Sequence, residues 1–375
     1  MRPVSADAQG DRRLGAQSAP EPRPELARIE HVVHGAVGTA ELTTHGMARG
    51  SVIDFSASTN PLGPPPGVLE ALRGLTAEHA ARYPDPTAGR LRERLAERHG
   101  VAANQVIAGN GSAELIWLLA LAYARPAPER VLIVGPTFGE YERASRLMGA
   151  AVAWHTARSE SDFAVDVASG ITRITRERPR LAWLCNPNNP TGAYLRGEQI
   201  AQLLAACVIA GTLLVVDEAY LPFVREADSV VDQLDSGHLF LLRSMTKDYG
   251  LAGIRLGYGL GAPAVVAALR TVQAPWSVSA VAQAAGEAAL ADETHLERSR
   301  QEVWAARTLL VDGLRALGCV VPEPAANFAV AEIPAGWTDA AQVREALFGH
   351  GCVVRDCASF GLPRHIRVGV RARGE

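Results

Sequence analysis

The sequence is short of the features that mark several specialised classes of protein. Its five cysteines are irregularly spaced, which fits neither a disulfide framework nor a zinc site, and no metal is predicted. A net charge of −3 leaves no basic excess for nucleic acid and no acidic tail. No apolar run reaches the roughly 20 residues that span a bilayer, and the start lacks the apolar core of a secretory signal. We therefore expect a cytoplasmic protein that binds neither nucleic acid nor membrane.

The sequence contains enough apolar residues for more than one hydrophobic core. At 375 residues and 48% hydrophobic, it is longer than a typical single domain. Short apolar stretches alternate with helical segments, which predicts an α/β fold with a mostly parallel sheet covered on both faces. We assign 1–33 to a disordered N-terminal extension and 34–66 to an arm that contributes to a small domain. Residues 67–272 would form the large domain, and 273–375 the C-terminal small domain with its linking helix.

The chemistry of the sequence centres on Lys247. The apolar run Leu239–Leu242 predicts a buried strand, so the lysine would lie past a strand end, where open α/β sheets bind ligands. A desolvated, charge-flanked lysine loses its proton readily and can form a Schiff base. The hydroxyls of Ser244 and Thr246, with Arg255, are suited to hold a phosphate beside it. The alternative for this motif alone is a solvated loop lysine.

A second candidate anion site lies at the glycine-rich turn Gly109–Ser112. The turn follows a predicted strand and leads directly into an apolar helix, with Ser112 as the expected N-cap. Free backbone N–H groups and the helix dipole attract an anion there, and glycine lets a phosphate approach closely. The alternative is a turn whose glycine and serine only cap the helix.

Asp217 ends an apolar predicted strand, where a carboxylate is costly unless it has a cationic partner. A protonated pyridine nitrogen is such a partner, and that pairing makes pyridoxal phosphate an electron sink. Tyr220 and Asn189 can hydrogen-bond a phenolate oxygen, and Phe138 can stack on a flat ring. The alternatives are a helix cap or local ion pair for Asp217 and core packing for Phe138.

Together these motifs resemble the aspartate-aminotransferase superfamily of pyridoxal-phosphate enzymes, which have fold type I. The matching segments follow the family's order and spacing from about residue 34 onward: Asn186-Pro-Asn-Asn-Pro-Thr-Gly192, Asp217-Glu-Ala-Tyr220, Ser244-x-Thr-Lys247 and Arg255-Leu-Gly-Tyr258. The resemblance implies a large domain with a mostly parallel seven-stranded sheet between helices, and a smaller α+β domain.

The resemblance also implies a role for each matching position. Lys247 would carry pyridoxal 5'-phosphate, and Asp217 and Tyr220 would complete the catalytic group. Further cofactor contacts would come from Ser112, Ala113, Phe138, Asn189, Ser244, Thr246 and Arg255. Tyr83 would reach the cofactor phosphate of a partner subunit, which implies a homodimer with shared active sites.

Two branches of the family compete for the reaction. Histidinol-phosphate aminotransferases and the threonine-phosphate decarboxylases of cobalamin synthesis share the motifs at 109–112 and 186–192. His34-Gly35, the segment 54–63 and Pro275–Val278 favour the decarboxylases. We therefore predict decarboxylation of L-threonine O-3-phosphate to (R)-1-aminopropan-2-yl phosphate. The alternatives are a histidinol-phosphate-type aminotransferase, a phosphoserine decarboxylase, and a non-catalytic binding protein with the same fold.

The substrate would be a phosphorylated amino acid. By resemblance, Arg367 would clamp its carboxylate, and a guanidinium fork suits that group geometrically. Arginines crowd the last residues of the chain, and such a cluster can hold two anionic groups at once. The predicted substrate contacts are Asn60, Arg355, Arg367 and Arg371, with surface positions as the alternative for Arg355 and Arg371.

Overall fold

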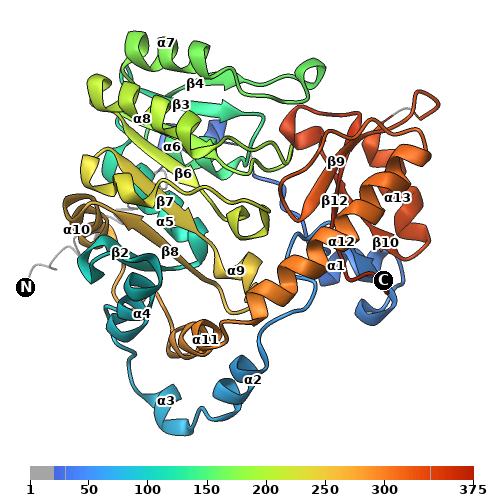
Figure 1. Ribbon diagram of the computed structural model, residues 1–375, viewed down its shortest axis with the longest axis horizontal. Coiled ribbons are helices and arrows are strands. Elements are labelled where there is room, and N and C mark those ends of the chain that lie inside the picture. The colour runs from blue at the N-terminus through green and yellow to red at the C-terminus, as the bar shows by residue number, and fades with distance from the viewer. Residues whose placement is uncertain (1–20, 30, 338) are drawn as a thin grey trace, which may run out of the picture.

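The computed structural model describes residues 21–29, 31–337 and 339–375 and places a large domain beside a smaller one (Figure 1). Most of the predicted N-terminal extension lies outside the described residues. Its described part forms the 3-10 helix η1 (Pro24–Arg28) and includes Val32, which lies against Gly139 of the large domain. The residue boundaries assigned to the domains stay a prediction.

The large domain is built on a seven-stranded sheet in the order β2-β8-β7-β6-β5-β3-β4. Its strands are β2 (Val106–Asn110), β3 (Arg130–Gly135), β4 (Ala151–Thr156), β5 (Leu181–Cys185), β6 (Leu213–Asp217), β7 (Leu239–Arg243) and β8 (Leu256–Gly261). Neighbouring strands are parallel, except that β8 is antiparallel to both β2 and β7. The predicted α/β class and mostly parallel sheet are confirmed.

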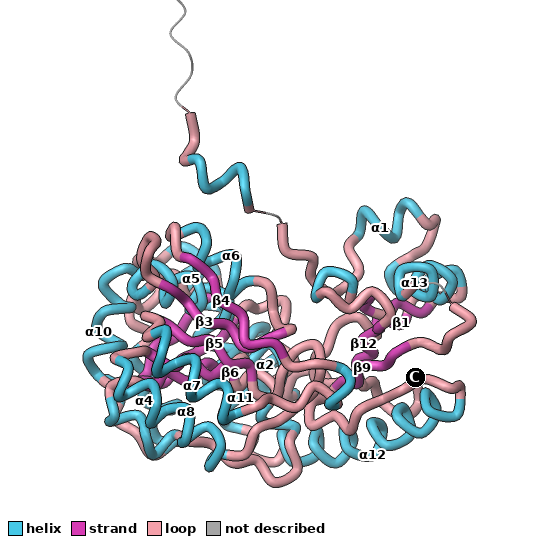
Figure 2. The backbone as a smooth tube through the Cα atoms, turned by 90° about the horizontal axis from the view of Figure 1, so that it is seen from above, coloured by secondary structure: helices cyan, strands magenta, loops and turns pink. Residues whose placement is uncertain are grey.

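Helices cover both faces of this sheet because alternate residues of each strand point to opposite sides. On β6, Leu214 and Val216 belong to one buried cluster and Val215 to the other. The first face carries α2 (Pro66–Arg73), α4 (Gly89–His99), α7 (Val167–Glu177), α8 (Gly197–Ala210) and α11 (Ala280–Ala291). The second carries α5 (Gly111–Tyr123), α6 (Glu140–Leu147) and α10 (Pro263–Val272). Figure 2 shows the strands between these two groups of helices.

The small domain combines a three-stranded antiparallel sheet with helices. The sheet has the order β11-β12-β9, and its strands are β9 (Phe328–Glu332), β11 (Arg355–Asp356) and β12 (His365–Gly369). The arm after η1 supplies α1 (Thr39–Thr44) and β1 (Ile53–Asp54), which pairs in parallel with β10 (Cys352–Val353). The remaining helix of this domain is α13 (Ala340–Gly349).

Three further α-helices belong to the described part of the chain. The 22-residue α12 (His295–Ala316) runs from the large domain into the small one (Figure 1). The short helices α3 (Ala77–Ala81) and α9 (Met245–Asp248) lie at the edge of the large domain and at a strand end, respectively. Among the described residues, none of the helices is both long enough and apolar enough to cross a membrane.

Candidate active site

A cavity of about 550 Å³ opens at the carboxyl ends of the central strands, where the small domain faces the large one. It is lined by every sequence-predicted cofactor residue except Tyr83, and by one predicted substrate residue, Arg367. The predicted residues in its wall are Ser112, Ala113, Phe138, Asn189, Asp217, Tyr220, Ser244, Thr246, Lys247, Arg255 and Arg367. Residues from six separate segments of the chain therefore meet as the motifs indicated.

Lys247 reaches the cavity from α9, the single helical turn that follows the buried strand β7. Burial lowers the pKa of its amine, and the charges of Arg367 and Arg255 lower it further, to about 8; Asp217 acts in the opposite direction. Near neutral pH a far larger share of this amine than of an ordinary lysine is therefore neutral and nucleophilic. Lys247 is also the only lysine in the sequence, which by itself singles it out as the one side-chain amine that can form a Schiff base.

Asp217 is the last residue of β6 and is 5% exposed. Its Oδ2 accepts a hydrogen bond of 2.7 Å from the Tyr141 hydroxyl, and its Oδ1 one of 3.0 Å from the backbone N–H of Ala219. Burial raises the pKa of Asp217, against those hydrogen bonds and the charge of Lys247. The carboxylate is thus fixed in orientation and buried, and it fits a pyridinium N–H that would neutralise it. Tyr141 was not predicted, because an aromatic inside a helix resembles ordinary core.

The predicted anion site at the start of α5 has a different cap from the one expected. The helix begins at Gly111, so Ser112 lies inside the first turn and is not the N-cap. A Cβ on Gly111, which has φ +74°, would lie 2.8 Å from Arg255 Nη2. Glycine is therefore required for the guanidinium to lie against this backbone. First-turn N–H groups and a guanidinium form a donor set that fits a phosphate.

Two hydroxyls and a stacking aromatic complete the cofactor end of the cavity. Ser244 Oγ and Thr246 Oγ1 lie 2.6 Å apart, and both side chains are buried. Phe138 meets Tyr141 edge-on, with 5.7 Å between the ring centroids. The Lys247 amine lies 5.6 Å from the centroid of the Tyr220 ring. This set has a cradle for phosphate, a carboxylate for a ring nitrogen and an amine for an aldehyde, so it fits pyridoxal phosphate.

Arg367 is held in the cavity wall by contacts from both domains. Its Nη1 donates to Asn189 Oδ1, and its Nη2 donates to the carbonyl oxygen of Ser56 at 2.6 Å. Its guanidinium carbon lies 5.2 Å from the centroid of the Phe328 ring. Its buried Nε has no hydrogen-bond partner among the described residues. A cation fixed in this way at the cavity wall is suited to a carboxylate.

The structure does not bring Arg355 and Arg371 to the wall of this cavity. Arg355 is 4% exposed, and its Nη2 donates to Ser359 Oγ at 2.6 Å and to the carbonyl oxygen of Val33 at 3.0 Å. It therefore ties the small domain to the chain segment before the arm. Arg371 pairs with Glu375 at 3.1 Å. Substrate contacts from these two arginines stay predictions that this arrangement does not support.

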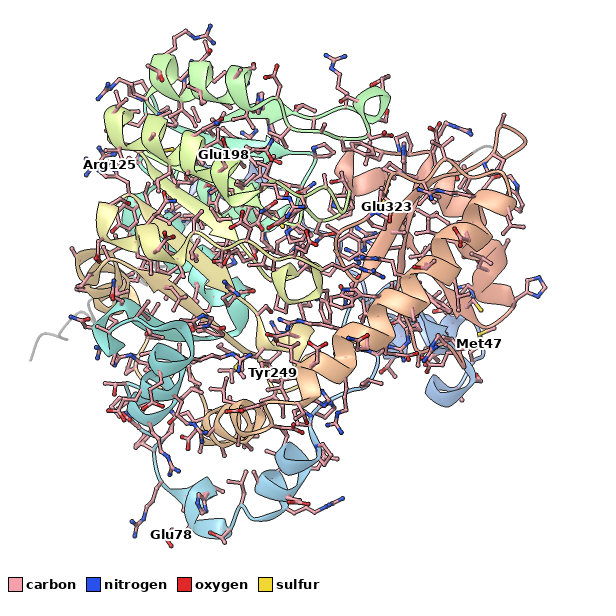
Figure 3. All side chains as sticks on the ribbon, in the orientation of Figure 1. Met47, Glu78, Arg125, Glu198, Tyr249 and Glu323 are labelled. Atoms are coloured by element: carbon pink, nitrogen blue, oxygen red, sulfur yellow. The ribbon has the colours of Figure 1, made fainter. Side chains whose placement is uncertain are left out.

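Asn60 is 3% exposed and lies behind the cavity, outside its lining. Its backbone N–H donates to the Lys247 carbonyl at 2.9 Å. Its side-chain Nδ2 donates to the Asp248 carbonyl and to Ser299 Oγ on α12, both at 2.7 Å. Figure 3 labels Tyr249, which directly follows α9 at this junction with α12. Asn60 thus holds the backbone that carries the lysine instead of facing a substrate.

Tyr83 lies outside the cavity and is 78% exposed. Its ring stacks on that of Trp276, with 4.3 Å between the centroids, and Trp276 is itself 42% exposed. Two stacked aromatics on a surface leave a large apolar area in water. This placement is compatible with the predicted contact to a partner subunit.

The sequence profile of the family described as aminotransferase class I and II matches residues 50–375. The chain belongs to this family. A histidinol-phosphate aminotransferase of Rhodospirillum centenum is 36% identical over 94% of both chains. A putative threonine-phosphate decarboxylase of Caldanaerobacter subterraneus is also 36% identical, over 84% of this chain and 85% of that one. The predicted membership of the superfamily is confirmed.

The solved structures extend this likeness to the fold. The histidinol-phosphate aminotransferase of Sinorhizobium meliloti, in complex with pyridoxal-5'-phosphate, superposes with a TM-score of 0.83 at 24% identity and covers 95% of both chains. This member of the class I and II aminotransferase family therefore has fold type I, as predicted.

Proposed function

We propose that this protein is a pyridoxal-phosphate-dependent carboxy-lyase that converts L-threonine O-3-phosphate to (R)-1-aminopropan-2-yl phosphate, in cobalamin synthesis. The observation that carries the proposal is the presence of Lys247, Asp217 and Arg367 in one cavity wall. That wall offers an amine, a buried carboxylate and a fixed guanidinium, so an amino acid can be bound by both its amino and its carboxylate group. The motifs at 54–63 and 275–278 and the similarity to a putative threonine-phosphate decarboxylase support this choice.

The residues that would hold the cofactor follow from the donor set. Lys247 would bind its aldehyde carbon, Asp217 its ring nitrogen, and Ser112 and Arg255 its phosphate. When bound, the cofactor withdraws electrons from the substrate carbon that carries the amino group. Tyr141 keeps Asp217 oriented through the 2.7 Å hydrogen bond, so the carboxylate can hold a proton at the ring nitrogen.

The remaining work falls to Arg367 and Lys247. Arg367 would hold the substrate carboxylate, and in this reaction the bond between Cα and the carboxylate carbon is the one that breaks. Carbon dioxide leaves, and Cα then needs a proton. Lys247 lines the same cavity and, in its protonated ammonium form, would deliver that proton to Cα.

A second candidate is a histidinol-phosphate-type aminotransferase. The specific observation in its favour is the similarity to proteins of that name, including the one from Rhodospirillum centenum. Both reactions use the same cofactor residues and differ in which bond to Cα is broken. Amino transfer removes the proton of Cα, with Lys247 as the base.

One experiment separates the two candidates. The cofactor-loaded protein is incubated with phosphothreonine, with phosphoserine, and with histidinol phosphate plus 2-oxoglutarate. Release of carbon dioxide with aminopropanol phosphate supports the lyase, and glutamate formation without carbon dioxide rejects it. Phosphoserine is included because one methyl group in a pocket discriminates by only about 1–3 kcal/mol.

We also propose that the protein acts as a homodimer with shared sites. The exposed stack of Tyr83 on Trp276 supports this arrangement, because a partner subunit would bury it.

A further inference from the structure

The cavity wall contains more basic side chains than the cofactor and a carboxylate require. Five of the lining residues are basic: His34, Arg143, Arg255, Arg367 and Lys247. Lys247 and Arg255 lie at the cofactor end, and Arg367 is held by Asn189 and Ser56. His34 and Arg143 remain, and neither belongs to the motifs that assigned the other residues. They are the two basic residues of the wall that have no role in the proposed contacts to the cofactor or to the substrate carboxylate.

Arg143 is built into the wall by two helices. It lies on α6, and its guanidinium carbon is 5.5 Å from the centroid of the Trp117 ring on α5. Its Nη1 lies 3.4 Å from Glu140 Oε1, a long contact for a hydrogen bond, and its buried Nε has no partner among the described residues. The aromatic ring therefore fixes a guanidinium whose donors are poorly satisfied.

His34, Glu140 and Arg143 form one corner of the cavity, and the single carboxylate of Glu140 is shared between the two basic side chains. Its Oε1 is shared between Arg143 and His34, whose Nε2 lies 3.1 Å away. Burial acts to raise the pKa of Glu140, but the His34 hydrogen bond and the Arg143 charge outweigh it and hold the pKa below its usual value. One carboxylate thus faces two basic groups, and the exposed part of the Arg143 side chain lines the cavity, where it can meet an incoming anion.

We propose that Arg143 binds the distal anionic group of the substrate, a phosphate monoester, with His34 as a second donor at the same corner. That the substrate is phosphorylated rests on the proposed function. Arg355 and Arg371, the arginines that the sequence suggested for a second anion, are engaged outside the cavity wall, whereas Arg143 is 28% exposed and lines it. A guanidinium suits a phosphate because its fork can bind two oxygens at once.

The test compares phosphorylated and unphosphorylated forms of the same compound. Binding to the cofactor-loaded protein is followed by the change in visible absorbance of the cofactor. The two pairs are phosphothreonine with threonine and histidinol phosphate with histidinol, so the subsite is tested whichever reaction is catalysed. Loss of one charged hydrogen-bonding group predicts that Arg143→Gln weakens binding of the phosphorylated compound about 10- to 100-fold. Binding of the unphosphorylated compound should change less than about twofold.

Two variants serve as references. Arg146→Gln removes an arginine from the same helix that pairs with Glu142 at 2.8 Å and does not line the cavity, so it should leave both affinities unchanged. Arg143→Lys keeps the charge without the fork and should restore part of the affinity for the phosphorylated compound.

Each outcome decides the matter. If Arg143→Gln keeps the full preference for the phosphorylated compound, the subsite is overturned and the proposed function stands. Equal weakening of both compounds also overturns it, because Arg143 would then only support the cavity. If the unaltered protein shows no preference in either pair, both the subsite and the phosphorylated substrate are rejected.

Discussion

The acidity of the Lys247 ammonium is the property of the site that can be measured most directly. In the cofactor-free protein, burial together with Arg367 and Arg255 lowers its pKa from the 10.5 of an ordinary lysine to about 8. At pH 7 about 9% of this amine would be neutral, against roughly 0.03% for an ordinary lysine, a difference of about 300-fold. The neutral amine is the form that reacts with an aldehyde or an acylating reagent.

The assay uses the fact that the sequence has a single lysine. An amine-selective acylating reagent can label only Lys247 and the terminal α-amino group, and mass spectrometry of the two peptides separates them. The labelling rate of Lys247 is measured from pH 6 to pH 11, and its midpoint is expected near pH 8. Burial slows the reagent equally at every pH, so it lowers the plateau and leaves the midpoint in place.

Neighbouring charges should move this midpoint in opposite directions. Removing a positive neighbour favours the ammonium, so Arg367→Gln should raise the pKa of Lys247. Removing a negative neighbour disfavours it, so Asp217→Asn should lower that pKa. Arg371→Gln, outside the cavity wall, is the control and should change nothing. A midpoint at pH 10 or above in the unaltered protein, or a downward shift in Arg367→Gln, would refute this account of the site.

Three further predictions concern the dimer, the buried carboxylate and the core. Lys247→Ala and Tyr83→Ala subunits, each inactive alone, should regain about a quarter of the original activity when mixed, because half of the dimers then hold one complete shared site; no recovery would contradict shared sites. Asp217→Asn should keep the visible band of the bound cofactor but lose at least about a hundredfold in turnover, and retained turnover would remove Asp217 from the mechanism. Glu218→Ala should cost about 3–5 kcal/mol of unfolding free energy in denaturant titrations, since it leaves Arg243, 2.6 Å away and 11% exposed, unpaired; a loss below 1 kcal/mol would contradict this.

The fold and the cofactor end of the site could be predicted from the sequence because both depend on local patterns. The continuous apolar strand 213–216 required burial on both faces, which only a covered parallel sheet provides. Strand ends of a parallel sheet meet at one edge, so Asp217 and Lys247 had to approach each other once their strands were placed. The order of the motifs along the chain then identified the family.

The substrate end could not be predicted in the same way, because it depends on contacts between distant segments. Arg355 and Arg367 are direct partners in the β11–β12 ladder, so their side chains lie on the same face of that sheet. The strand pattern in the sequence therefore does not distinguish one arginine from the other. Arg367 donates a hydrogen bond to Asn189 at the cavity, whereas Arg355 donates one to the carbonyl oxygen of Val33 outside the cavity wall. Neither partner lies near its arginine in the sequence.

Arg143 was missed for a related reason. Four of the seven residues of the segment 140–146 are charged, which is typical of a solvated helix. Whether one of its arginines faces water or a cavity depends on the rotation of α6 about its axis. That rotation is set by the packing of Tyr141 and Ala144 into the core beneath, which only the tertiary structure reveals.

Asn60 joins three parts of the chain that a domain movement would otherwise separate. Its hydrogen bonds reach the backbone of Lys247 and Asp248 in the large domain and Ser299 on α12, the helix that continues into the small domain. A rotation of the small domain must therefore either break these bonds or displace the lysine backbone with it. Where the bonds hold, a rotation that closes the cavity over a substrate would also move the reactive amine, so closure and alignment of the amine would occur in one motion.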